Sequence, residues 1–195
     1  MRKLYKYRDL KDFRFFIDII LNNRLYAASY TNLNDPMEGY YRYTTGELTQ
    51  EVLDHIKGEK QKLGICSLSS KDNIELMWSH YCDGHRGVVI GVEIDSTKYE
   101  VKPIMYNGLS NISRNETEDL NYKAIAKSIL INKHTIWSYE KEVRAFVEGS
   151  NFINVKVIEL ILGEKMDTRT QSFVKKLVEK IDSNIEVRMS NIYNI

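Results

Sequence analysis

The run Val88-Val-Ile-Gly-Val-Glu-Ile94 constrains the fold more than any other segment of this chain. Its β-branched aliphatic residues are typical of a strand, and Gly84 and Gly87 mark a tight turn before it. A strand this apolar is stable only when both of its faces are buried, so we expect it at the centre of a sheet.

The other segments alternate less regularly than a doubly wound fold requires. Further strands are predicted at 4–7, 24–30, 63–69, 99–106, 137–147, 155–162 and 185–189, and helices at 10–21, 45–58, 73–81, 122–131 and around 173–181. Asp9 is the expected cap of the first helix, Asp72 or Asn73 that of the third, and Pro103 indicates an edge strand or a bulge. The pattern predicts one α+β domain, residues 1–195, with a mixed, largely antiparallel central sheet flanked by helices.

Composition narrows the classes of function. The formal net charge is +1, and 43% of the residues are hydrophobic. This charge excludes strong long-range electrostatic attraction of nucleic acid, but it is compatible with a local basic groove. The longest apolar runs are a few residues, so neither a signal sequence nor a membrane span is expected. Cys66 and Cys82 fit free thiols, and we expect a cytoplasmic protein.

The segment Trp137-Ser-Tyr-Glu-Lys-Glu-Val-Arg144 combines two carboxylates with a guanidinium. As a strand it would place Glu140, Glu142 and Arg144 on one face and Trp137, Tyr139 and Val143 on the other. The first face has the composition of a site, in which Arg144 relieves the repulsion between the carboxylates. The alternative is a solvated strand face with a salt bridge of little energetic worth.

Several motifs along the chain together resemble a known family. They are Leu4-Tyr-Lys-Tyr-Arg8, Asn34-Asp-Pro-Met-Glu38, Ser67-x-Ser69, Met77-Trp-x-His-Tyr81, Gly84-His-Arg-Gly87 and Trp137-x-Tyr-Glu-x-Glu-x-Arg144. In this order they resemble, over nearly the whole chain, the bacterial domain-of-unknown-function family numbered 2971. That family carries no settled activity, so the resemblance implies no function.

A second resemblance is to the mono-ADP-ribosyltransferases of the Arg-Ser-Glu type. Lys6 in a first strand, then Ser67 and Ser69, then Glu140 and Glu142 follow that family's order, although Lys6 stands where arginine or histidine is usual and binds phosphate as a point charge. The resemblance implies an ADP-ribosyltransferase-like fold, with NAD as substrate and no metal. It implies a nucleic-acid or protein acceptor, or water in the case of an NAD glycohydrolase. An antitoxin or another partner protein is expected if the chain has a toxin or phage-defence role.

The same resemblance implies roles for individual residues. Glu142 would stabilise the ribosyl cation that forms when nicotinamide leaves, and Glu140 would orient or deprotonate the acceptor. The implied NAD site comprises Lys6, Tyr7, Arg8, Ser67, Ser69, Trp78, His80 and Tyr81, and the other expected site residues are Asn34, Asp35, Glu38, Trp137, Tyr139 and Arg144.

Other interpretations of the polar residues stay open. In the second interpretation, Asp35, Glu38, Glu140 and Glu142 hold Mg²⁺ for phosphodiester cleavage, and Lys6 or Lys133 neutralises the developing charge. His80-x-Cys82-x-x-His85 lacks a second ligand pair at zinc spacing. A non-catalytic domain that binds a nucleotide or a partner protein is the third class. The aromatic residues Trp78, Tyr81, Trp137 and Tyr139 fit a core as well as a stacking platform.

Overall fold

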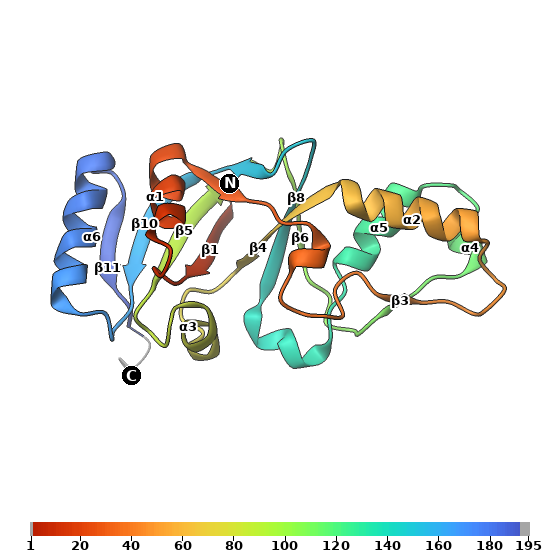
Figure 1. Ribbon diagram of the computed structural model, residues 1–195, viewed down its shortest axis with the longest axis horizontal. Coiled ribbons are helices and arrows are strands. Elements are labelled where there is room, and N and C mark those ends of the chain that lie inside the picture. Colours follow the sequence, from red (N-terminus) through yellow and green to blue (C-terminus); the bar gives the residue numbers. More distant parts are fainter. Residues whose placement is uncertain (1, 192–195) are drawn as a thin grey trace.

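In the computed structural model, which describes residues 2–191, the strand predicted at 88–94 is an interior strand of a seven-stranded sheet (Figure 1). The strand order is β11 (Glu186–Met189), β10 (Lys156–Leu162), β5 (Val88–Ile94), β1 (Arg2–Arg8), β4 (Leu63–Ser69), β8 (Glu142–Glu148) and β6 (Glu100–Pro103). Within this sheet β10 and β11 run parallel and the other neighbours antiparallel. The structure therefore confirms the α+β class with a mixed, largely antiparallel sheet.

Helices cover both faces of the sheet and one of its ends. They are α1 (Phe13–Asn22), α2 (Gln50–Lys62), α3 (Glu75–Tyr81), α4 (Arg114–Thr117), α5 (Tyr122–Leu130) and α6 (Thr168–Ile181), with 3₁₀ turns η1 (Tyr30–Asn32) and η2 (Thr135–Glu140). Two small strand pairs join β2 (Arg24–Tyr26) to β9 (Phe152–Asn154) and β3 (Tyr41–Arg42) to β7 (Ser110–Asn111). Figure 1 shows α1 and α6 at the β10–β11 end and α2, α4 and α5 beyond β8.

The main core lies between the sheet and helices α1 and α6. Ile90 on β5 packs there with Phe16 of α1 and Val174 of α6. The next residue back, Val89, points to the opposite face, where Trp78 of α3 covers it. Because β5 is covered on both faces, its almost wholly apolar sequence is explained.

Several predicted helix and strand ends need correction. Asp12, and not Asp9, caps α1, since its side chain accepts a hydrogen bond from the backbone N–H of Arg14. Helix α2 begins later than predicted, after the Thr49 cap. Helix α3 has Ile74 at its cap position with no side-chain cap, so neither Asp72 nor Asn73 serves that role. The strand predicted at 24–30 shortens to β2, whereas Pro103 does lie at the end of an edge strand.

The strand predicted from Trp137 to Val147 is wrong in its first half. Residues 135–140 form η2, and Lys141 then takes a left-handed conformation with φ 48° before β8 begins at Glu142. Trp137 and Tyr139 therefore do not share a strand face with Val143. Glu142 and Arg144 do share one face of β8, while Glu140 reaches the same place from the end of a 3₁₀ turn.

The sheet opens between β1 and β4. Strand β1 pairs with β5 at every residue from Arg2 to Arg8, but with β4 only at Tyr5 and Ser69. Past that pair, the ammonium of Lys6 donates a hydrogen bond to the carbonyl oxygen of Ser67 at 2.9 Å. A side chain thus bridges the two strands where backbone pairing has stopped, and the opening becomes part of a cleft.

Candidate functional site

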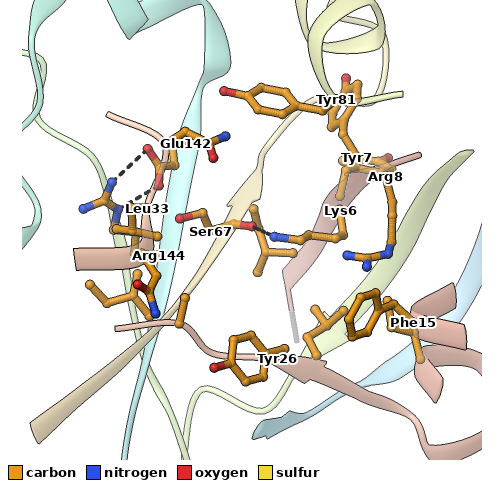
Figure 2. A pocket seen from close by; sticks show the side chains of 18 of the residues that line it. Lys6, Tyr7, Arg8, Phe15, Tyr26, Leu33, Ser67, Tyr81, Glu142 and Arg144 are labelled. Atoms are coloured by element: carbon orange, nitrogen blue, oxygen red, sulfur yellow. Dashed lines mark hydrogen bonds and ion pairs between the residues drawn. The ribbon is translucent and has the colours of Figure 1, made fainter. Parts of the chain in front are cut away.

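The cleft has a volume of about 1050 Å³ and is lined from many parts of the chain. Strands β1, β4 and β8 form its floor, α1, β2 and Phe152 one end, and the loop after η1 together with Tyr81 and Glu140 the other (Figure 2). A cavity of this size is enough for a dinucleotide-sized ligand.

Five ionisable side chains form a buried network at one end of the cleft: Glu38, Lys133, Glu140, Glu142 and Arg144. The Lys133 ammonium donates to Glu140 Oε2 at 2.6 Å and to Glu142 Oε2 at 3.0 Å. Three carboxylates and two cations leave this network with a formal charge of −1. Such a group is stable in a protein interior only because nearly every charge is paired.

Arg144 is the centre of that network and is 0% exposed. Its Nε donates to Glu142 Oε1 at 2.7 Å, and its two terminal nitrogens grip both oxygens of Glu38 at 2.8 and 2.5 Å. A further hydrogen bond reaches the carbonyl oxygen of Leu130 at 2.6 Å. Arg144 therefore ties the 34–38 loop and the end of α5 to β8. The alternative of a solvated strand face with a weak salt bridge is wrong.

The electrostatic consequences are clearest at Glu142. Burial by itself would raise the pKa of this carboxyl, but Arg144 and Lys133 outweigh burial and hold the pKa at about 2. Burial would likewise lower the pKa of Lys133, and Glu142 with Glu140 raises it above its ordinary value. Glu142 is therefore a fixed negative charge across the physiological pH range and not a proton acceptor.

Glu140 sits differently, between a phenol and an ammonium. The hydroxyl of Tyr81 donates to Glu140 Oε1 at 2.6 Å while Lys133 holds the other oxygen. Burial, together with this carboxylate, raises the pKa of Tyr81, so the phenol keeps its proton. Asn34 also hydrogen-bonds Tyr81. Glu140 thus faces the cleft with an immobilised carboxylate.

The β1 side of the cleft has the opposite charge. Lys6 and Arg8 both line it, and among the ion pairs of residues 2–191 neither has a carboxylate partner. The Arg8 guanidinium lies 5.0 Å from the ring centre of Phe15, and its Nε is buried without a hydrogen-bond partner. Burial lowers the pKa of Arg8. An anionic group bound in the cleft would compensate the positive charge of both Lys6 and Arg8.

The structure brings most, but not all, of the predicted site residues together. Those that line the cleft are Lys6, Tyr7, Arg8, Asn34, Glu38, Ser67, Tyr81, Glu140, Glu142 and Arg144, and those that do not are Asp35, Ser69, Trp78, His80, Trp137 and Tyr139. The first group comes from β1, β4 and β8, from helix α3, from the 3₁₀ turn η2 and from the loop after η1. Only tertiary structure could join them.

Three of the predicted site residues that do not line the cleft have structural roles instead. Ser69 is buried and donates to the carbonyl oxygen of Glu140 at 2.7 Å, which fixes the turn before β8. Trp78 is fully buried, packs edge-on against Tyr7 and donates its indole N–H to the carbonyl of Asp72. Asp35 accepts from the backbone of Met37 and so shapes the loop that carries Glu38.

The other three lie around the site. His80 is exposed, with its ring near those of Tyr81 and Tyr139. Trp137 lies under the ammonium of Lys133, 4.8 Å from ring centre to nitrogen, so it supports the network from behind. His80, which was predicted in the NAD site, and Trp137 and Tyr139, which were predicted elsewhere in the site, therefore do not line the cleft.

Sequence reasoning missed several residues of the site. Lys133 entered only as a helper in the nuclease hypothesis, and Tyr106, whose hydroxyl oxygen accepts from the backbone N–H of Glu142 at 2.7 Å, did not enter at all. Phe15 and Tyr26 also line the cleft. A lone lysine or tyrosine in a loop carries no local signal, and Phe15 lies within the helix predicted at 10–21, where a single aromatic residue does not indicate a site.

The carboxylates are not arranged as a metal centre. Within residues 2–191, no three His, Cys, Asp or Glu side chains are grouped as ligands for a metal ion. The oxygens of Glu38 and Glu142 instead accept hydrogen bonds from Arg144.

Within residues 2–191, no helix combines the length and the apolar composition needed to cross a bilayer.

Comparison with protein families finds a match to the family described as "Protein of unknown function (DUF2971)", over residues 77–145. The resemblance to this family is supported over that segment. The segment runs from α3 to β8 and contains Tyr81, Lys133, Glu140, Glu142 and Arg144. Comparisons with curated proteins and with solved structures find no match.

Proposed function

We propose that the protein cleaves the bond between nicotinamide and ribose in NAD, and passes ADP-ribose to a nucleic-acid or protein acceptor, or to water. One observation carries the proposal. On one side of a cleft of dinucleotide size lie Lys6 and Arg8, which form no ion pair within residues 2–191, and on the other side lies a buried carboxylate network. NAD has the matching distribution of charge, an anionic pyrophosphate and a cationic nicotinamide ring.

Lys6 and Arg8 are suited to the phosphates. The Arg8 guanidinium presents a fork of donors, and Lys6 adds a point charge whose present partner is one backbone carbonyl. Both residues belong to β1, which is fixed along its whole length by β5. The cations are therefore held in place before the ligand arrives, which lowers the entropic cost of binding.

Glu142 is suited to stabilise positive charge. As nicotinamide leaves, the electrons of the C1′–N bond go to the pyridine nitrogen and C1′ becomes cationic. The Glu142 carboxylate remains ionised because its pKa is about 2, so it can face that cation without first losing a proton. Lys133 and Arg144 hold its two oxygens in place.

Glu140 is suited to the acceptor step. The acceptor forms a bond from oxygen or nitrogen to C1′ and gives up a proton, and Glu140 can receive that proton before it passes to solvent. Its position between Tyr81 and Lys133 keeps the carboxylate oriented toward the cleft. The supposed cytoplasmic location and the toxin or phage-defence role stay predictions.

A nuclease that uses Mg²⁺ is the alternative enzyme class. It would need Asp35, Glu38, Glu140 and Glu142 to converge on an ion, whereas Asp35 does not line the cleft and Glu38 grips Arg144 with both oxygens. The observed pairing favours the NAD hypothesis. A non-catalytic nucleotide-binding domain would use the same cations without turnover.

The experiment uses the purified chain with NAD labelled separately in nicotinamide and in adenine, in the presence of EDTA. Release of labelled nicotinamide is expected, with adenine label retained on an acceptor or as free ADP-ribose. Labelled RNA and DNA with Mg²⁺ are incubated in parallel. Cleavage of nucleic acid without nicotinamide release would establish the nuclease instead, and no reaction in either arm would leave the binding domain.

A further inference from the structure

Two aromatic side chains at the end of the cleft farther from Tyr81 have no part in the chemistry described above. Phe15 on α1 and Tyr26 on β2 both line the cleft, and each is 56% exposed. Figure 2 shows both rings beyond Lys6, on the side away from Tyr81. Large rings exposed inside a cleft mark binding surfaces more often than rings scattered on a surface.

The Tyr26 ring is held in place by contacts with neighbouring side chains. Tyr26 packs edge-on against Phe152 with 5.8 Å between ring centres, and the guanidinium of Arg24 covers the Phe152 ring at 4.0 Å. Arg24 is in turn held by Asp18 through hydrogen bonds of 2.7 to 3.2 Å. This chain of contacts fixes the Tyr26 ring although more than half of its surface is free.

Phe15 has a cation beside it. The Arg8 guanidinium lies over the Phe15 ring at 5.0 Å, so an aromatic surface and an anion-binding group adjoin each other. The two together match a ligand in which a flat ring is joined to a phosphate by a short linker.

We infer that Phe15 and Tyr26 form a subsite on which the base of a nucleotide stacks, while the phosphates of the same nucleotide bind Arg8 and Lys6. The ligand class is thus a nucleoside diphosphate or a larger molecule that contains one. The inference rests on the proposed function only for the identity of the complete ligand as NAD. Stacking reads the π-face of a base, so discrimination between bases at this subsite is expected to be weak.

The test is calorimetric binding of ADP and of ribose 5-diphosphate, which has the same sugar and diphosphate but no base. ADP is expected to bind at least about tenfold more tightly, because the two ligands differ only in the base that stacks. Phe15→Ala and Tyr26→Ala should each weaken ADP binding about tenfold and leave the binding of ribose 5-diphosphate unchanged. Phe15→Trp, which keeps an aromatic face, should retain ADP binding.

Phe173 provides a matched control, because it is also a phenylalanine that is 56% exposed but lies on α6 and does not line the cleft. Phe173→Ala should leave ADP binding unchanged. Equal affinity for ADP and ribose 5-diphosphate, or undiminished ADP binding by both the Phe15→Ala and the Tyr26→Ala variant, overturns the inference.

NAD cleavage measured on the same proteins separates the two claims. ADP binding that depends on Phe15 without any nicotinamide release would support the subsite and contradict the proposed reaction. Nicotinamide release that is insensitive to Phe15→Ala and Tyr26→Ala would support the reaction and contradict the subsite.

Discussion

Among single residues, Arg144 contributes most to the stability of the buried charge network. Arg144→Ala would leave Glu38 and Glu142 buried with Lys133 as their remaining cation. Loss of one partner from a buried ion network costs about 3 to 5 kcal/mol, so we expect the unfolding free energy to fall by that amount in urea titration. Arg188→Ala removes a guanidinium from a more exposed network and should cost less. Equal losses in the two variants would contradict the central position of Arg144.

Glu142 combines a catalytic and a structural task. Glu142→Gln removes the negative charge that the proposed reaction needs, so turnover of NAD is expected to fall at least about a hundredfold. The carboxylate also accepts from Arg144 and Lys133, so the unfolding free energy should fall by about 1 to 3 kcal/mol as well. Thermal melts and a turnover assay measure the two effects separately. A folded variant with full turnover would leave Glu142 a structural role alone.

The pH dependence of stability follows from the same carboxylate. The pKa of Glu142 is about 2 in the folded chain against an ordinary value of 4.5. The folded state therefore gains stability above about pH 4.5, and this gain is lost as the pH falls toward 2. Denaturant titrations between pH 5 and 2 should show a steeper fall for the native chain than for Glu142→Gln. Parallel curves would contradict the lowered pKa.

At this scale the sequence predicted which charged side chains meet, but not how the backbone brings them together. Glu140, Glu142 and Arg144 were expected on one strand face, and they do meet, because η2 and the left-handed Lys141 return Glu140 to the cleft. Ser69 and Trp78 were misassigned because a polar or aromatic residue beside a site can serve the backbone or the core instead.

At the scale of elements, the loop that carries Glu38 depends on a buried lysine. Lys60 of α2 donates to the carbonyl oxygen of Gly39 at 2.7 Å and lies over the rings of Tyr30 and Tyr41 at 4.9 and 5.0 Å. Its ammonium thus holds the chain directly after Glu38. No local pattern signals this contact, because α2 alone reads as a helix with solvated lysines.

Lys60→Met should therefore loosen this loop. We expect amide hydrogen exchange across residues 30–42 to become faster, because the Gly39 carbonyl loses its donor and the two rings lose the cation. Lys57→Met on the same helix changes an exposed lysine and provides the control. Unchanged exchange in Lys60→Met, or an equal increase in Lys57→Met, would contradict this role.

At the scale of the whole molecule, the α+β class followed from local periodicity, but the strand order did not. Strand β1 lies in the middle of the sheet although Lys6 and Arg8 make it look like a polar edge. The reason is its incomplete pairing with β4, which opens a cleft where those cations are accommodated. Pairing between strands far apart in the sequence depends on contacts that no local window contains.

A crystal structure of the chain with bound NAD tests the proposed function most directly. We predict the pyrophosphate within hydrogen-bonding distance of Lys6 and Arg8, the nicotinamide ribose beside Glu142, and the adenine against Phe15 or Tyr26. NAD bound outside this cleft, or bound with its nicotinamide at Phe15 and its phosphates away from Lys6 and Arg8, would contradict it.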